Sequence, residues 1–387
     1  MNTPPIYLDN STITHPSKRA LNRMIPLLSE NWGHPSQPHA VGQKTHSPIR
    51  SSLEAIYKVL GADPKDNCIF TSSGAEAVNH AVWSGYMDVM LPSGKTQFIT
   101  SITEEAPAIM AIGRLERLGA ASRSAPVDKR GRVTAEAIGD LFSPRTAMVS
   151  LSWANAMTGV IHPLEEIAAI CQERGVRLHV DLTHVLGKIT FDLKNLSCAY
   201  ATYDGSLLHA PQGSGIFFVQ KDLSLSPLIA GGSEQGGYRA GAFDIAALAA
   251  LAEASLEAVE TRDLLSTETA RLRDKFETGI LAGYEEAEVF FQKEERLPHV
   301  SLIGFHGVVN EALLFQLNRR GVYASIGGGS HQQTSLHLTA AGVDKETAVT
   351  AVNFSLSRET TEEEIDRAIN IIVESAKKLR KVSGNLI

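Results

Sequence analysis

The chain has 387 residues, which is too long for one compact core, so we expect two domains or one large domain with an appendage. Its hydrophobic content of 43% is typical of a globular protein, and a net charge of −7 provides no basic surface for nucleic acid or an anionic membrane. No run approaches the roughly 20 apolar residues that a membrane span needs, and the N-terminus has no secretion signal. We therefore expect a cytoplasmic protein that binds neither nucleic acid nor membrane.

Three cysteines are present, Cys68, Cys171 and Cys198, and they lie far apart without CxxC spacing. Cys68 and Cys171 have apolar neighbours in sequence. Buried free thiols in a reducing compartment are therefore expected, rather than a disulfide framework or a metal site.

Short apolar runs alternate with helical patterns through the first two-thirds of the chain. The helical segment 163–174 begins with Pro163, has two glutamates in its first turn and is followed by Gly175, which are ordinary start and stop signals. This alternation predicts βαβ units and an α/β domain whose mainly parallel sheet is flanked by helices. The strand-like runs are 68–71, 97–100, 147–151 and 177–180.

The stretch DGSLLHAPQGSG, residues 204–215, reads as a loop that feeds a buried strand at 216–219. Its glycines and proline are typical of an active-site turn. No nucleophilic residue stands where such a turn would present one.

From Asp244 onward the pattern becomes a long helical stretch rich in Ala and Leu. The final segment opens with a capping signature, Thr361 and Glu364, and strand-like pieces lie near 300–303 and 352–356. These features predict a smaller α+β domain. We place the large domain at 15–255 and assign 1–14 and 256–387 to the small one.

A series of motifs along nearly the whole chain resembles the class V aminotransferases, specifically the NifS/IscS-type cysteine desulfurases. The resemblance implies a homodimer of the pyridoxal phosphate (PLP) transferase fold type I, with a large and a small domain. The motifs are YLDNSTIT (7–14), HPSQPHAVG (34–42), FTSSGAEAVNHA (70–81), WANAMTG (153–159), LHVDLTHVLGK (178–188), GGSEQGGYRAG (231–241) and FSLSRETTEEEID (354–366).

The loop at 204–215 departs from the family pattern Ser-Gly-His-Lys-x-x-Gly-Pro-Lys-Gly, in which the lysine forms the Schiff base. A gapless match puts Asp204 at the serine, Ser206 at the histidine and Leu207 at the lysine. Lys221 follows five strand residues, about 16 Å along the strand. Lys188 matches a Gly-Lys of the family that lies outside the pocket. No neighbouring lysine therefore replaces the missing amine.

Two cofactor positions are retained or nearly so. Asp181 matches the acid that pairs with the pyridine nitrogen, and His184 stands where the family usually has Gln against a cofactor oxygen. A purely local capping role for Asp181 remains an open alternative.

Other cofactor positions are altered. Glu105 replaces a stacking His, and a carboxylate would repel a phosphorylated cofactor. At Gly74 and Ala75 the phosphate-binding Thr hydroxyl is missing, although two backbone N–H groups at a helix start remain available for an anion. Ala156 replaces the Asn that would bind the phenolic oxygen.

The substrate side has changed as well. Asn353 occupies the place of the Arg that clamps the substrate carboxylate, and Ser330 that of the persulfide Cys in the loop 324–335, which is also readable as an ordinary flexible tip. Asn155 and Arg239, in the motifs above, are candidate substrate-binding residues.

These losses favour a catalytically degenerate cysteine desulfurase homologue. Such a protein would keep no covalent cofactor, would leave non-covalent binding as the only mode open to PLP, and would act as a homodimer by binding. An active desulfurase, an iron–sulfur or sulfur-transfer protein, or a small ligand are the candidate partners. No metal site is expected from histidine spacing.

Two alternatives remain open. The cleft can serve an enzyme of another class, with Glu104, Glu105, Asp204, His184 and Ser206 as acid–base groups that bind a metal or a cationic substrate. The other alternative is an active PLP-dependent cysteine desulfurase or aminotransferase.

Overall fold

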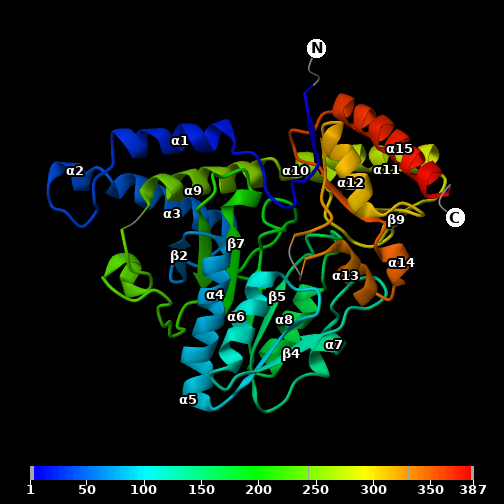
Figure 1. The fold of residues 1–387 in the computed structure, drawn as a ribbon. Helices are drawn as coiled ribbons and strands as arrows, with labels where there is room; N and C mark the ends of the chain where they lie inside the picture. The colour runs from blue at the N-terminus through cyan, green and yellow to red at the C-terminus, as the bar shows by residue number, and fades with distance from the viewer. Residues whose placement is uncertain (1–3, 243, 329–331, 385–387) are drawn as a thin grey trace.

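The computed structural model describes residues 4–242, 244–328 and 332–384. At its centre lies a seven-stranded sheet of order β2-β8-β7-β6-β5-β3-β4, in which only β8 runs antiparallel to its neighbours (Figure 1). The predicted mainly parallel sheet is therefore confirmed. Its strands are β2 (Asn67–Thr71), β3 (Gln97–Ser101), β4 (Ala121–Ala125), β5 (Thr146–Ser152), β6 (Arg177–Asp181), β7 (Tyr200–Asp204) and β8 (Gly215–Val219).

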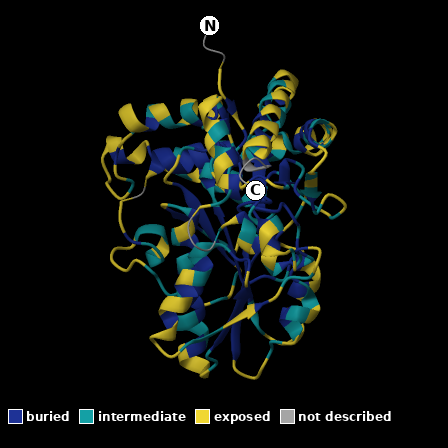
Figure 2. Cartoon of the chain, turned by 45° about the vertical axis from the view of Figure 1, so that its right-hand side comes forward, coloured by how far each residue is buried: buried dark blue, intermediate teal, exposed yellow. Residues whose placement is uncertain are grey.

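Helices cover both faces of this sheet, because successive strand residues point to opposite sides. Phe98 and Met148 belong to the core under α4 and α6, whereas their neighbours Ile99 and Val149 belong to the core shared with α8 and α9. Figure 2 shows the buried strands between the partly exposed helices. The helices of this part are α1 (Lys18–Ser29), α2 (Ala40–Gln43), α3 (His46–Leu60), α4 (Gly74–Gly85), α5 (Leu91–Ser93), α6 (Ala106–Glu116), α7 (Ala135–Gly139), α8 (Leu164–Glu173) and α9 (Ile245–Glu260).

A second, smaller core forms around an antiparallel sheet of order β12-β10-β9. The N-terminal residues join it, because β1 (Ile6–Tyr7) pairs in parallel with β11 (Val322–Tyr323). The predicted α+β part is therefore confirmed, and the first residues return to it. Its other elements are β9 (Ala287–Phe290), β10 (Val300–Phe305), β12 (Ala351–Ser355), α11 (Ala270–Gly283), α12 (Asn310–Arg319), α13 (Thr334–Ala340), α14 (Lys345–Ala348) and α15 (Glu362–Gly384).

The helical stretch predicted from Asp244 is helical but not continuous. After α9 come a short α10 (Arg262–Leu264) and a π-helical turn (Leu265–Thr269) before α11 begins. The domain boundary expected after residue 255 falls inside α9, and the two-domain division stays a prediction.

The C-terminal helix α15 begins as its sequence predicts. The Thr361 N–H donates to Glu364 Oε2 at 2.8 Å, and the Glu364 N–H donates back to Thr361 Oγ1 at 3.3 Å. This reciprocal capping box satisfies two backbone donors at the helix start.

The three cysteines are free thiols, and Cys171 and Cys198 are buried. Among the described residues, no helix combines the length and apolar character needed to cross a membrane.

Candidate functional site

A pocket of about 270 Å³ opens at the carboxyl ends of β6 and β7, and we call it the β6–β7 pocket. Asp181 is the last residue of β6 and Asp204 the last of β7, so two parallel strands bring their acids to one edge, where α/β sheets bind ligands. The described residues that line it are Ser11, Thr12, Gly74, Ala75, Val78, Glu105, Pro107, Ala156, Met157, Asp181, Thr183, His184, Asp204, Ser206, Leu207, Gly328 and Gln332.

The loop after β7 turns sharply before it enters β8. Residues Gly205–Leu207 form a 3-10 turn, and Asp204 Oδ1 accepts hydrogen bonds from the Ser206 N–H at 2.8 Å and hydroxyl at 2.6 Å. A Cβ on Gly205 would lie 2.4 Å from Ser214 Oγ, so the close packing requires glycine there. The turn presents Leu207, an 8% exposed aliphatic side chain, to the pocket.

The N-terminus of α4 also reaches this pocket, and Asp204 occupies it. The Gly74 N–H donates to Asp204 Oδ2 at 2.7 Å, across 130 residues of sequence. The expectation that both backbone N–H groups there remain available for an anion is therefore wrong for Gly74. The protein's own carboxylate fills the position that favours an anionic ligand.

Asp181 is stabilised locally. Its Oδ1 accepts from the Thr183 N–H at 2.8 Å, which agrees with a capping role at the strand end. Burial nevertheless raises the pKa of Asp181 to about 6. No lysine or arginine among the described residues forms an ion pair with it.

Glu105 and His184 form a pair in the pocket wall. His184 Nε2 lies 3.4 Å from Glu105 Oε1, and Gln332 donates to Glu105 Oε2. Burial raises the pKa of Glu105, but the hydrogen bonds with His184 and Gln332 and the charges of His184 and His337 together outweigh burial and hold the pKa below its ordinary value. Glu105 is therefore a carboxylate at neutral pH.

Glu104 does not face the pocket, contrary to its expected role as an acid–base group of the cleft. Its carboxylate is 4% exposed, accepts the Ser152 hydroxyl, and accepts the Ser152 N–H at 2.9 Å. Burial raises its pKa to about 7. The residue joins β5 to the start of α6, so its role here is structural.

Two of the candidate substrate residues lie behind the pocket wall. Asn155 accepts the N–H groups of Met157 and Thr158, both at 3.0 Å, and donates to Thr103 O at 3.2 Å. Asn353 is fully buried on β12 and donates to Met157 O at 2.7 Å. Neither side chain lines the pocket, while the neighbouring Ala156 does.

Arg239 also lies outside the pocket wall. It pairs with Glu76 of α4, with Nε 2.9 Å from Oε1, and so ties the loop 231–241 to that helix. Ser330, the candidate at the cysteine position, lies outside the described residues.

The two lysines nearest the loop in sequence do not line the pocket either. Lys188 Nζ lies 3.5 Å from Leu207 O, in a separate cavity of about 30 Å³ behind the turn, and burial lowers its pKa to about 8. Lys221 pairs with Asp63 at 3.0 Å. Their predicted placement outside the pocket is confirmed.

The described lining therefore contains three carboxylates and His184, but no Lys, Arg or Cys. Such a set can accept hydrogen bonds and attract positive charge, whereas it offers no amine for an imine and no thiol for sulfur transfer. Nowhere in the described ranges do three His, Cys, Asp or Glu side chains gather closely enough to hold a metal ion.

Comparison with known proteins identifies the family to which the chain belongs. Residues 6–368 match the class-V aminotransferase model. The chain is 34% identical over 382 residues to the cysteine desulfurase NifS of Azotobacter vinelandii, covering 98% of this chain and 94% of that one. A cysteine desulfurase of Gluconacetobacter diazotrophicus is 33% identical over 384 residues, covering 98% and 95%.

A solved structure agrees with these sequence matches. A NifS-like protein superposes with a TM-score of 0.90 at 29% identity, covering 97% of this chain and all of that one. The fold is that of PLP-dependent transferase fold type I. The chain belongs to the class-V aminotransferase family and is a homologue of the NifS-type cysteine desulfurases.

Proposed function

We propose that this protein is a degenerate member of its PLP-dependent family, which makes no cofactor imine and acts by binding. The main support for the proposal is the lack of an amine in the described pocket wall around Leu207. At the position that the family pattern gives to the Schiff-base lysine stands a side chain with no nitrogen, and the described lining holds no other amine. An aliphatic group can neither form an imine nor move a proton.

The pocket also lacks the features that a phosphorylated cofactor needs. Asp204 Oδ2 already accepts the Gly74 N–H at 2.7 Å, so an incoming phosphate would meet a carboxylate at the start of α4. Glu105 and Asp181 add further negative charge, and His184 is paired with Glu105. The described residues therefore do not fit PLP, and this proposal drops the non-covalent binding that the sequence left open.

The binding role has two parts in this proposal. The chain forms a homodimer, as expected from its family resemblance, and it presents that scaffold in the cytoplasm to an iron–sulfur or sulfur-transfer protein or to a small ligand. Similarity to cysteine desulfurases over 98% of the chain supports a retained scaffold. Sedimentation equilibrium on the purified protein tests the dimer directly.

Sulfide release from L-cysteine, with PLP added, tests the loss of catalysis. We expect release at the no-protein background, while the Azotobacter vinelandii relative serves as the positive control. Release above background, abolished by borohydride, would show an active desulfurase and overturn the proposal.

A double variant tests whether Leu207 and Asp204 account for the loss of PLP binding. Leu207→Lys supplies an amine, and Asp204→Ser removes the carboxylate that blocks the helix start. We expect a visible absorbance band of bound PLP, bleached by borohydride, in the double variant and not in the wild-type protein. A band in the wild-type protein would contradict the account.

A further inference from the structure

The free hydrogen-bonding capacity of the β6–β7 pocket is mostly that of acceptors. Glu105 is held ionised beside His184, Asp181 ends β6 without an ion-pair partner among the described residues, and Asp204 is committed to Gly74 and Ser206. No basic side chain other than His184 lines the described wall. The described pocket wall thus carries negative charge that its own side chains do not fully compensate, which is unfavourable in a partly enclosed space.

His184 adds an independent acceptor. Its side chain is only 8% exposed, and Nε2 lies 3.4 Å from Glu105 Oε1, a contact that requires the proton on Nε2. Within the described ranges, Nδ1 has no hydrogen-bond partner, and the ring lines the pocket. In the neutral imidazole ring, Nδ1 is then an unpaired acceptor for a donor that enters the pocket.

The remaining wall is apolar. Val78, Pro107, Met157 and Leu207 line it beside the acids. The volume of about 270 Å³ lies just below the range of about 300–1,000 Å³ that drug-sized ligands occupy. The occupant is therefore a small molecule with an apolar portion and a polar head.

We propose that the β6–β7 pocket binds a small organic cation, in which an ammonium or guanidinium group on a short apolar chain contacts Asp181, Glu105 and His184 Nδ1. Such a head supplies several N–H donors and the positive charge that the wall lacks. This inference rests on the proposed function, because a pocket that held an anionic cofactor would have no room for this ligand.

The pH dependence of cation binding follows from the same groups. Burial raises the pKa of Asp181 to about 6, while Glu105, His184 and Thr183 are the groups that face it. A cation binds the ionised carboxylate in preference to the protonated one. Binding should therefore strengthen from pH 5 to pH 7 and release a proton at the lower end.

Isothermal titration calorimetry of the full-length protein with agmatine and with putrescine provides the test, with 1-butanol as the uncharged analogue. We expect saturable binding of at least one diamine-type probe and none of the alcohol. Asp181→Asn and Glu105→Gln should each weaken binding at least about tenfold. Glu165→Gln, which removes an exposed acid on α8, should change it less than about twofold.

Thermal unfolding of each variant verifies its fold, and two independent pocket variants keep the test open if one of them fails to fold. Absence of saturable binding by either probe, or equal weakening by Glu165→Gln, would overturn the inference. Such a result with sulfide release still at background would leave the proposed function intact. Sulfide release from cysteine would instead overturn the proposed function itself.

Discussion

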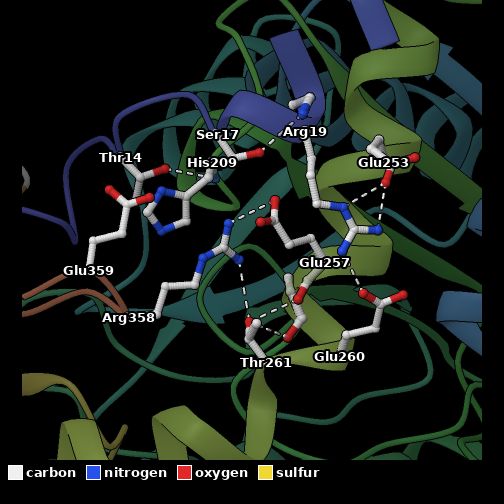
Figure 3. Close-up of polar contacts among 12 residues, drawn as sticks. Thr14, Ser17, Arg19, His209, Glu253, Glu257, Glu260, Thr261, Arg358 and Glu359 are labelled. Atoms are coloured by element: carbon white, nitrogen blue, oxygen red, sulfur yellow. Dashed lines mark hydrogen bonds and ion pairs between the residues drawn. The ribbon is translucent and has the colours of Figure 1, made fainter. Parts of the chain in front are cut away.

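Leu207 lines two cavities, one on each side of its turn. The carboxylates of the two regions differ in whether an arginine pairs with them. In the region behind the turn, the glutamates of α9 have arginine partners (Figure 3). Arg19 lies 2.6 Å from both Glu253 and Glu260, and Arg358 Nη2 lies 2.9 Å from Glu257 Oε2, although not aligned as a hydrogen bond. These pairs join α1 and the segment before α15 to α9.

The pocket in front of the turn has the opposite arrangement. Its acids, Glu105, Asp181 and Asp204, have one histidine and several N–H donors, but no lysine or arginine among the described lining residues. Charges that only support a fold are normally paired when buried. The difference agrees with the proposal that the pocket acids bind a cationic ligand, whereas the α9 acids support the fold.

The largest expected effect comes from breaking the pairing behind the turn. Arg358→Met should destabilise the protein by up to about 3 kcal/mol, because it leaves Glu257, whose side chain is only 16% exposed, without its cation. Arg19→Met is the control, since Arg19 is 46% exposed and its pairs should contribute no more than about 1 kcal/mol each. Urea unfolding measures both, and equal losses would remove the distinction between buried and exposed pairs.

Asp181→Asn should act in the opposite direction and stabilise the protein. The folded-state pKa of about 6 lies above the ordinary value of 3.8, so ionisation penalises the folded state increasingly between about pH 4 and 6 and fully above that range. We expect a gain of up to about 3 kcal/mol at pH 8 and none at pH 3.5. A gain independent of pH would show that the charge is not its cause.

Asp204→Ser should open the helix start to an anion. The substitution frees the Gly74 N–H and removes a repelling charge, so the affinity for inorganic phosphate should rise about tenfold, or 1.4 kcal/mol. Asp263→Ser, which removes a 95% exposed acid, is the control for net charge. Equal gains in both variants would point to a general electrostatic effect, measured by thermal shift against phosphate concentration.

The smallest effect on ligand binding is expected at Arg239. Arg239→Met should loosen the loop 231–241 and raise the pKa of Glu76, but leave the affinity for agmatine unchanged within about twofold, because Arg239 lies outside the pocket wall. Calorimetry measures the affinity. A large loss would make Arg239 a ligand-binding residue, as its place in the family motif suggested.

Local periodicity predicted the parallel sheet and the smaller α+β part, and the family motifs named nine of the residues that line the described pocket wall. The edge strand β4 escaped notice, since Ala121–Ala125 alternates without large apolar residues. The break after α9 was also missed. Residues 261–269, TRDLLSTET, contain no Gly or Pro, so no helix-breaking residue marks the π-helical turn at Leu265–Thr269.

The site contacts that matter most were beyond sequence reasoning, because they join distant residues. The Asp204–Gly74 hydrogen bond spans 130 positions, and Glu104 reaches Ser152 on another strand while its neighbour Glu105 faces the pocket. Adjacent glutamates look alike in sequence. Only the turn between β3 and α6 decides which of them contacts a ligand.

The central claim is that no amine of this protein forms an imine with pyridoxal phosphate. Incubation of the native protein with PLP, borohydride reduction, and peptide mapping by mass spectrometry test it most directly, with the Leu207→Lys, Asp204→Ser double variant as the positive control. We predict no stoichiometric pyridoxyl adduct in the wild-type protein. A stoichiometric adduct on Lys188, whose amine lies 3.5 Å from Leu207 O, or on any other lysine would contradict the claim.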